Sequence, residues 1–316
     1  MDGNPNGTVI DGYLDCLLTQ RQLSLDTLAA YRRDLAALQT FVGNTVLADV
    51  SHFQIRQFAA KLHAQGIGPR SIARTLSAWR GFFRWLAEQT PMVANPVDGV
   101  RPPKRARTLP KALSVDDAVR LVSDKGDSGA DDAIRLRDRA MFELLYSSGL
   151  RVSELAGLDL QHVRQQDYAS NSWLDAEAGE VIVTGKGSRQ RSVPVGKPAL
   201  VAITAWLVVR PQLAKNDAGS DSYALFVGTR GARITPRTVQ LRLKAHALTQ
   251  GIPADVHPHM LRHSFASHLL QSSGDLRAVQ ELLGHASIAS TQVYTSLDFQ
   301  RLAQVYDAAH PRAKKK

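Results

Sequence analysis

Six polar residues of the chain have the types that phosphoryl transfer without a metal ion requires. Guanidinium groups can bind two non-bridging phosphate oxygens at once, and their charge matters most when negative charge gathers in the transition state. A tyrosine hydroxyl can act as a covalent nucleophile, although its pKa of about 10 calls for a basic or cationic neighbour. The six residues lie at the edges of predicted elements rather than on apolar faces: Arg151, Lys186, His259, Arg262, His285 and Tyr294.

Arg151 and Lys186 are placed where a cation can reach an anion. Arg151 follows Gly149 at the start of a short predicted helix, where backbone N–H groups attract negative charge. Lys186 stands between two glycines at the tip of a predicted hairpin, from which its side chain can extend outward. Each has an ordinary explanation too, because Arg151 could simply pair with Glu154 and a Gly-Lys-Gly turn is often only a soluble turn.

His259 and Arg262 are three residues apart on one predicted helix, so their side chains share a face. His263 follows His259 by four residues, a spacing that also suits a zinc site. The segment HMLRH lacks the glutamate of a zinc-protease helix, which argues against that interpretation. We therefore expect neither a metal ion nor another cofactor.

His285 follows Gly284 just beyond a predicted helix end, and Tyr294 lies nine residues later on another short predicted helix. Taken singly, each functional interpretation is weaker than a structural one, so the case depends on the joint order and spacing of the six residues. Tyr294 also competes with four other tyrosines: Tyr146, Tyr168, Tyr223 and Tyr306.

The part of the chain that must position these residues is predicted to be mostly helical with one small sheet. Ser114 and Asp117 open one helix in the manner of a capping box. Two β-rich runs, 180–184 and 190–195, flank a turn-forming connection and predict a hairpin. Further helices are expected at 132–148, from 151, and at 198–209, 236–250, 258–271, 275–283, 287–296 and 299–309.

Residues 1–97 are predicted to form an all-helical N-terminal domain. Ser24 can cap a helix that runs through about Val42, and Ser51 can cap another that ends near Gly66. Residues 98–110 read DGVRPPKRARTLP, whose prolines and basic residues predict an extended linker before a catalytic domain over 111–316. A basic linker can follow a phosphate backbone, and we expect Lys104 and Arg105 to bind DNA.

The segment from Pro69 to Gln89 predicts a strongly two-faced helix. At about 100° per residue, its large apolar side chains gather on one side of the helix. Ser77 and Gly81 lie on the other side, where small side chains would let a phosphate backbone approach closely. No acid lies between Arg70 and Arg84 to interrupt this side, so we favour a nucleic-acid face over an ordinary solvated one. The same side carries four arginines: Arg70, Arg74, Arg80 and Arg84.

Composition narrows the class of protein. The 316 residues include 39 Lys and Arg against 29 Asp and Glu, a formal net charge of +10, which favours a polyanionic partner such as nucleic acid. The length predicts two domains. The single cysteine, Cys16, excludes a disulfide scaffold and fits a reducing cytoplasm. The longest apolar stretch, Ala199 to Val209, is too short to span a membrane, and the N-terminus lacks the basic region of a signal peptide.

Four segments resemble the signature segments of the tyrosine recombinase (phage-integrase type) family. They stand in the family's order and account for the whole C-terminal domain, while the N-terminal helices and basic linker resemble that family's core-binding domain. The resemblance implies a mainly α fold, with a SAM-like helical bundle before a mostly helical catalytic domain that holds a small antiparallel sheet. The segments are GLRVSELAGL, VTGKGSRQRSVPV, HPHMLRHSFASHLL and LLGHASIASTQVYT.

The resemblance also implies roles for the residues that move bonds and protons. Tyr294 would attack the scissile phosphate of double-stranded DNA and form a 3′-phosphotyrosyl bond. Lys186 would protonate the departing 5′ oxygen, and His259 would assist proton transfer to and from the tyrosine.

Three further residues would bind the phosphate. By the same resemblance, Arg151 and Arg262 would bind its non-bridging oxygens and His285 would donate a hydrogen bond to it. Strand rejoining would need neither ATP nor a metal ion, because the energy of the phosphodiester is kept in the tyrosyl bond.

The C-terminal ending STQVYTSLDFQRLAQVYDAAHPRAKKK resembles most closely the members of this family that resolve bacterial chromosome dimers. This implies a heterotetramer with a second, related recombinase on a dif-like DNA site, and an FtsK-like translocase as activator. The family docks its last helix onto a neighbouring protomer, and 299–309 is the matching segment here. Its apolar stripe is equally compatible with packing inside its own chain.

Several other functions remain compatible with the sequence. A mobile-element integrase or a type IB topoisomerase would use similar chemistry. A DNA-binding regulator with a relic catalytic domain would share the basic helix face but form no covalent bond to DNA, and the six intact residues argue against it. A zinc hydrolase that uses His259 and His263 would lose its activity in EDTA.

Overall fold

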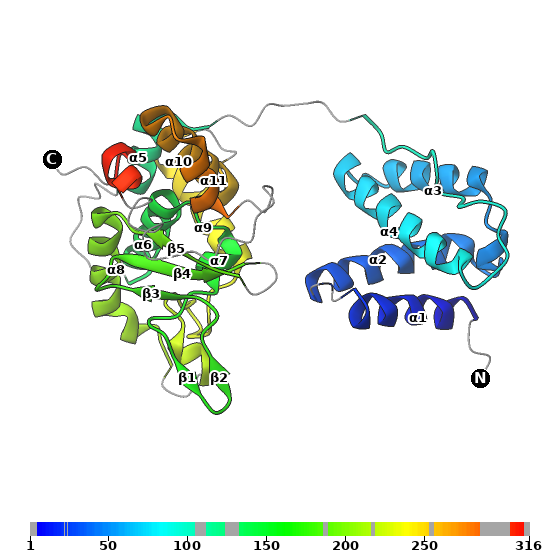
Figure 1. Ribbon diagram of the computed structural model, residues 1–316, viewed down its shortest axis with the longest axis horizontal. Helices are drawn as coiled ribbons and strands as arrows, with labels where there is room; N and C mark the ends of the chain where they lie inside the picture. The colour runs from blue at the N-terminus through cyan, green and yellow to red at the C-terminus, as the bar shows by residue number, and fades with distance from the viewer. Residues whose placement is uncertain are drawn as a thin grey trace. The chain divides into compact units, whose positions relative to one another are not determined.

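The computed structural model describes residues 5–21, 23, 25–104, 112–123, 133–185, 189–215, 219–252, 256–284 and 304–312. The chain divides into two compact units, Met1–Leu109 and Pro110–Lys316, and each has its own buried apolar core (Figure 1). The fold is mainly helical with a small antiparallel sheet, which confirms the predicted fold class.

The N-terminal unit is a bundle of helices whose apolar faces meet in one core. The predicted two-faced segment is the helix α4, and its Ile72, Trp79, Phe82 and Phe83 side chains are fully buried. Ser51 caps α3 in a capping box with Gln54, whereas the predicted cap Ser24 lies outside the described residues. The helices are α1 Pro5–Thr19, α2 Leu25–Val42, α3 His52–Ala64 and α4 Pro69–Ala87, with a short 3-10 helix, η1, at Leu47–Asp49.

A buried carboxylate joins α2 to α4. Asp34 accepts a hydrogen bond of 2.8 Å from the Thr75 hydroxyl and pairs with the Arg74 guanidinium, and its backbone carbonyl accepts one of 2.7 Å from the Trp79 indole. Burial raises the pKa of the Asp34 carboxyl, and the bonds from Thr75 and Arg74 only partly offset this. The acid that α4 itself lacks is thus supplied by its neighbour.

Gly81 does not provide open space for a phosphate backbone, so that expectation was wrong. A Cβ atom added at Gly81 would lie 2.6 Å from the hydroxyl oxygen of Tyr13 on α1. The glycine is needed because the buried Tyr13 ring packs against α4 at this point. Ser77 is exposed, as expected.

The sheet of the C-terminal unit contains the predicted hairpin. Strands β3 (Trp173–Asp175), β4 (Glu180–Thr184) and β5 (Gln190–Pro194) are antiparallel in the order β3-β4-β5, and Thr184 pairs with Gln190 at the end of the hairpin next to its connection. A separate two-stranded ribbon, β1 (Arg164–Gln165) with β2 (Tyr168–Ala169), is too short to leave a pattern in the sequence.

The helices of this unit surround α6, whose side chains are buried along most of its length. It packs against α5, α8, α9 and α10 (Figure 1). The predicted cap at Ser114 is present, since its hydroxyl accepts a hydrogen bond from the Asp117 N–H. The helices are α5 Val115–Val122, α6 Ala133–Ser148, α7 Val152–Ala156, α8 Lys197–Val209, α9 Pro236–Thr249, α10 Pro258–Ser273 and α11 Leu276–Leu283, with 3-10 helices η3 Arg210–Gln212 and η4 Gly219–Tyr223.

Residues 304–312 pack inside their own unit, the second of the two alternatives considered for the last helix. Tyr306 is buried and its ring stacks on His310 at 4.9 Å, while Arg312 pairs with Glu143 of α6. Burial lowers the pKa of His310 to about 3, so its imidazole is neutral in the folded protein. The remainder of the predicted segments 287–296 and 299–309 lies outside the described residues.

Across the ranges that the structure describes, no helix is both long enough and apolar enough to cross a lipid bilayer.

The chain turns from α6 toward α7 at Gly149, which predicts an unusually costly substitution. Gly149 has a φ of +58°, and an added Cβ would overlap the buried Phe265 ring. We expect Gly149→Ala to lower the free energy of unfolding by about 2–4 kcal/mol, through left-handed strain and overpacking. Denaturant unfolding of the full chain, followed by circular dichroism, measures this. Gly274→Ala is the matched control, with a φ of +67° in open space, and should lose about 1 kcal/mol. Equal losses would contradict the packing argument.

Candidate active site

Arg151 stands at the first turn of α7 with its side chain 38% exposed. Its backbone N–H and its guanidinium donate to the two carboxylate oxygens of Glu154, each at 2.8 Å. The anion expected at this helix start is therefore the helix's own Glu154. The pairing of Arg151 with Glu154, which the sequence offered as an ordinary explanation for this arginine, is therefore present. Part of the guanidinium still faces solvent.

Arg191 of β5 holds the other side of the Glu154 carboxylate. Its two terminal nitrogens donate to Glu154 at 2.9 and 3.0 Å, and its Nε donates to the Leu282 carbonyl at 3.2 Å. Burial raises the pKa of Glu154, but the bonds from Arg191 and Arg151 outweigh it and hold the pKa below its usual range. Glu154 is consequently ionised and shared by two arginines.

Arg262 of α10 is buried and binds backbone carbonyls instead of acids. It donates to Gly149 at 2.5 Å and to Leu283 at 2.6 Å. Burial and the nearby charge of Arg151 lower the pKa of Arg262 to about 10, with Arg191 adding to the effect, so the group stays protonated near neutral pH. A guanidinium has five N–H donors, which these two bonds do not exhaust.

We call Arg151, Glu154, Arg191 and Arg262 the arginine cluster. The cluster has three guanidinium groups and one carboxylate, which pairs with Arg151 and Arg191, so it carries a net positive charge within a partly buried space. An incoming phosphate would reduce the mutual repulsion of the guanidinium groups and supply acceptors for their remaining donors. The arrangement can therefore bind a phosphodiester and stabilise extra negative charge on it.

The end of α11 is fastened to this cluster. Arg191 and Arg262 bind the carbonyls of Leu282 and Leu283, the last two residues of the helix. Gly284 then ends α11 with a φ of +64°, and a Cβ added there would lie 3.1 Å from the Arg191 Nε. The chain position directly before His285 is thus fixed beside the guanidinium groups.

The structure describes half of the six predicted catalytic residues. It brings Arg151 and Arg262 together across 111 positions of sequence and places His259 in the exposed first turn of α10, its ring 6.3 Å from that of His257. Lys186, His285 and Tyr294 lie outside the described residues. No group of three or more His, Cys, Asp or Glu side chains suited to a metal ion occurs among the residues that are described.

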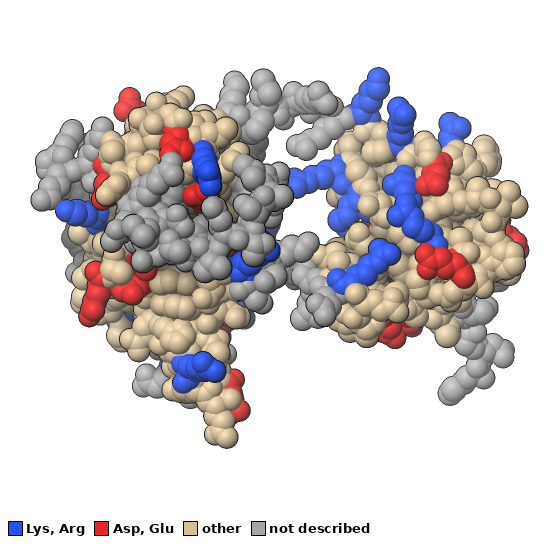
Figure 2. All heavy atoms as spheres, viewed as in Figure 1, with Lys and Arg blue, Asp and Glu red and all other residues tan. Residues whose placement is uncertain are grey.

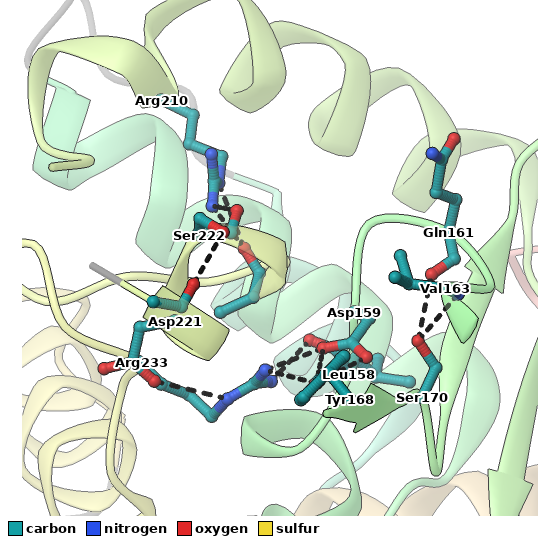
Figure 3. Close-up of polar contacts among 12 residues, drawn as sticks. Leu158, Asp159, Gln161, Val163, Tyr168, Ser170, Arg210, Asp221, Ser222 and Arg233 are labelled. Carbon is teal, nitrogen blue, oxygen red and sulfur yellow. Dashed lines mark hydrogen bonds and ion pairs between the residues drawn. The ribbon is translucent and has the colours of Figure 1, made fainter. Parts of the chain in front are cut away.

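A hollow of about 430 Å³ opens beside Glu154 and reaches Thr184, the last residue of β4. Its wall at Arg233 is held by a polar network, in which Arg233 donates to Asp159 at 2.7 Å and to the Leu158 carbonyl at 3.0 Å (Figure 3). The Tyr168 hydroxyl donates to the same carboxylate at 2.8 Å. The hollow therefore connects the arginine cluster with the hairpin whose connection carries Lys186.

Three of the four tyrosines that compete with Tyr294 have hydroxyls with a raised pKa, which makes them poor nucleophiles. Tyr146 and Tyr306 are buried, which raises the pKa of both hydroxyls. Burial and the bond to Asp159 raise the pKa of Tyr168. Tyr223 donates to Gln165 on the surface. In the described part of the chain, none of these hydroxyls has a recorded bond to the arginine cluster.

Sequence analysis missed Arg191 and named Glu154 only as a possible partner of Arg151. A signal was present, because Arg191 occupies an inward position of β5, two residues before the buried Val193. A charged residue at an inward strand position needs a buried partner. Which partner it finds depends on the tertiary fold.

The arginines predicted to bind DNA through α4 have mixed surroundings. Arg70 and Arg84 are exposed, Arg74 pairs with Asp34, and Arg80 is 3.4 Å from the Asp98 carboxylate. In the predicted linker, Lys104 is exposed and Arg105 lies outside the described residues. DNA binding by these side chains stays a prediction.

Comparison with known proteins matches both parts of the chain to protein families. The model of the phage integrase family matches residues 111–301, and that of the phage integrase N-terminal SAM-like domain matches residues 10–90. The chain is similar to tyrosine recombinase XerC 1 of Ralstonia nicotianae, with 58% identity over 97% of this chain and 94% of that protein. It is also similar to tyrosine recombinase XerC of Ralstonia pickettii, with 59% identity over the same shares.

Among solved structures, the crystal structure of XerH site-specific recombinase bound to a palindromic difH substrate aligns with a TM-score of 0.65. The alignment covers 90% of this chain and 80% of that one at 21% identity. At this identity the likeness shows the fold alone.

The shared carboxylate predicts a large cost for its removal. Glu154→Gln would leave Arg191 buried without its anion, and we expect a loss of about 3–5 kcal/mol in the free energy of unfolding, measured by denaturant titration. The matched control is Glu281→Gln, which removes an exposed pair with Arg277 in the same unit and should cost about 0.5 kcal/mol or less. Similar losses for the two variants would show that the Glu154 pairing is not structurally important.

The lowered pKa of Glu154 predicts a pH dependence of stability. A carboxyl whose folded pKa is depressed stabilises the protein fully above its unfolded pKa of about 4.3. That contribution disappears as the pH falls through the lower folded pKa. Between about pH 5 and pH 3, the wild type should therefore lose more stability than Glu154→Gln. Plots of the free energy of unfolding against pH for the two proteins should converge over this range. Parallel curves over this range would contradict the assignment.

Proposed function

The chain belongs to the phage integrase family of tyrosine recombinases, and from this premise we propose that it cuts and rejoins double-stranded DNA at a defined site through a covalent 3′-phosphotyrosyl intermediate. The observation that carries the proposal for this chain is the arginine cluster. Two arginines far apart in sequence, Arg151 and Arg262, meet at one place with an excess of positive charge.

In the proposed reaction, the scissile phosphate binds to Arg151 and Arg262 through its non-bridging oxygens. Both groups are held before substrate arrives, Arg151 by Glu154 and Arg262 by the Gly149 and Leu283 carbonyls. Little reorganisation is then needed when the phosphorus becomes five-coordinate and its oxygens gain charge. His285 follows the fastened end of α11 and donates a hydrogen bond to the phosphate.

Tyr294 is the proposed nucleophile. Its oxygen attacks phosphorus, the bond to the 5′ oxygen breaks, and Lys186 gives that oxygen its proton. His259 accepts the tyrosine proton and returns it when a 5′-hydroxyl attacks in the reverse direction. One phosphodiester is exchanged for another of similar energy, so the cycle balances without ATP and without a metal ion.

Within the family, we propose a XerC-like role in resolving chromosome dimers in the cytoplasm. The support is the identity of 58–59% to proteins named XerC over nearly the full chain. The partners would be a XerD-like recombinase in a heterotetramer on a dif-like site, with an FtsK-like translocase as activator.

The nucleophile is tested with a nicked suicide duplex that carries a dif-like site, with and without a XerD-like partner. We expect the wild type to form a denaturant-resistant protein–DNA adduct, because the short fragment bearing the 5′-hydroxyl diffuses away before it can rejoin. Tyr294→Phe should form no adduct while its DNA affinity stays within about twofold. Denaturing gel electrophoresis of the labelled duplex reads the adduct, and a mobility shift reads the affinity.

Tyr223→Phe is the matched control and should retain the adduct, since within the described ranges its hydroxyl donates to Gln165 at the surface and has no recorded bond to the arginine cluster. An adduct formed by Tyr294→Phe would assign the nucleophile to another residue. Tight binding without any adduct in the wild type would instead favour a regulator that does not cut DNA. Loss of the adduct in EDTA would instead favour a zinc-dependent enzyme that uses His259 and His263.

A further inference from the structure

Leu113, which directly precedes the cap of α5, has both of its backbone polar groups held by side chains of α10. Its N–H donates to the Ser264 hydroxyl at 2.9 Å, and its carbonyl oxygen lies 2.9 Å from Nε2 of His268. The Ser264 hydroxyl in turn donates to the Met260 carbonyl of its own helix at 2.9 Å. Leu113 is itself part of the buried core of the C-terminal unit. We call Leu113, Ser264 and His268 the α10 clamp.

The histidine of the clamp is also fixed by α6. Its Nε2 must carry a proton, because the Leu113 carbonyl can only accept a hydrogen bond. Burial lowers the pKa of His268 and keeps the imidazole neutral near neutral pH, so Nδ1 is an acceptor. The Tyr146 hydroxyl of α6 lies 3.0 Å from Nδ1 and therefore donates to it. His268 thus links α6 to the residue that leads into α5.

The α10 clamp is buried and uncharged. Ser264 and Tyr146 are fully buried, and His268 is almost so. Figure 2 shows the Lys, Arg, Asp and Glu side chains that lie on one face of the protein surface, whereas the clamp consists of neutral groups in the interior. A buried donor or acceptor that loses its partner costs free energy, so each of these bonds favours a single arrangement of Leu113 against α10.

The clamp holds the face of α10 that is turned away from the proposed catalytic groups. At about 100° per residue, Ser264 and His268 lie about 200° and 240° around the helix from Arg262. His259 lies only about 60° from Arg262 on the same scale. Arg262 is bound on its own side by two backbone carbonyls. The rotation of α10 about its axis is therefore fixed from both sides.

The end of α6 contacts both faces of α10. Tyr146 bonds to His268 on one face, and the Gly149 carbonyl accepts a bond of 2.5 Å from Arg262 on the other. A helix moves largely as one body, because its backbone hydrogen bonds join every turn to the next. A shift of α10 at His268 would therefore displace Arg262 from Gly149 as well.

We propose that Ser264 and His268 are positioning residues for the proposed strand cleavage, because by holding Leu113 against α10 they keep Arg262 where it can bind the scissile phosphate. The proposal rests on the proposed function and adds two buried residues to it. Stabilisation of a five-coordinate phosphate depends on donors that are placed in advance, and a displacement of about 1 Å can cost about 100-fold in rate. A clamp that only stabilised the fold would not alter the reaction rate of folded protein.

The rate of adduct formation on the nicked suicide duplex tests the proposal. The full-length protein is used in excess of the duplex and well above its dissociation constant, at a temperature where circular dichroism shows every variant to be folded. We expect Ser264→Ala to form the adduct about 10- to 100-fold more slowly, because the Leu113 N–H loses its acceptor and α10 can shift. Its affinity for the duplex, read by a mobility shift, should stay within about twofold, since binding is shared among many contacts.

Ser170→Ala is the matched control. Ser170 is buried in the same unit, and its hydroxyl makes the same two kinds of bond. It accepts from the Val163 N–H at 2.9 Å and donates to the Gln161 carbonyl at 3.4 Å (Figure 3). Because these bonds do not involve α10, adduct formation by this variant should stay close to the wild-type rate.

Tyr146→Phe is a second clamp variant, in case Ser264→Ala fails to fold. It keeps the buried ring but removes the hydroxyl that donates to His268. We expect it to slow adduct formation more than Ser170→Ala does.

A double-mutant cycle separates positioning from a general loss of stability. Arg262→Lys keeps the positive charge but cannot reproduce the guanidinium bonds to two carbonyls. Its adduct can be followed over long times, because the released fragment does not return. If the clamp acts through Arg262, Ser264→Ala should slow the Arg262→Lys protein by a much smaller factor than it slows the wild type.

Equal rates for the clamp variants and Ser170→Ala would overturn the proposal. Equal slowing by Ser264→Ala in the wild-type and Arg262→Lys backgrounds would overturn it too, and so would a loss of affinity large enough to explain the slower rate. If the wild type forms no adduct, the proposed function fails and this proposal falls with it. An adduct from the wild type together with unchanged rates in the clamp variants overturns this proposal alone.

Discussion

The site depends on how three buried or half-buried guanidinium groups find hydrogen-bond partners without losing their net positive charge. Burying a charge is costly unless it finds hydrogen-bond partners, and a carboxylate for each arginine would have solved this at the expense of the net charge. Here Glu154 is shared, while Arg262 is held by carbonyls of Gly149 and Leu283 and Arg191 also binds a carbonyl. Backbone dipoles fix the geometry and leave the positive charge available for a phosphate.

The fold and part of the site could be predicted because they follow from local patterns. The two-faced α4 and the hairpin of β4 and β5 depend on periodicity and turn residues, and both are present. Arg191 and Gly81 could not be assigned, since their surroundings come from distant segments: Arg191 meets Glu154 and α11, and Gly81 meets Tyr13. A sequence pattern identifies which face of an element is buried, but it does not identify the distant side chain that packs against that face.

The arginines of the N-terminal unit also show that a sequence pattern does not reveal tertiary contacts. Four of them share the polar side of α4, and charge patterning treats them as equivalent. The structure separates them, because Arg74 ties α2 to α4 through Asp34 and Arg80 holds the 97–100 segment, whereas Arg70 and Arg84 project from the surface. A basic stripe therefore contains both internal links and surface charges, and only tertiary contacts distinguish them.

The four residues of the arginine cluster all belong to one chain, and they come from three different elements and the residue before α7. In the proposed reaction, exchange of one phosphodiester for another is nearly isoenergetic, so a preformed cluster would accelerate cleavage and rejoining alike and would not set a direction. Under this proposal, the direction and timing of the reaction would be set by delivery of the nucleophile and by the order in which the DNA strands are presented to it.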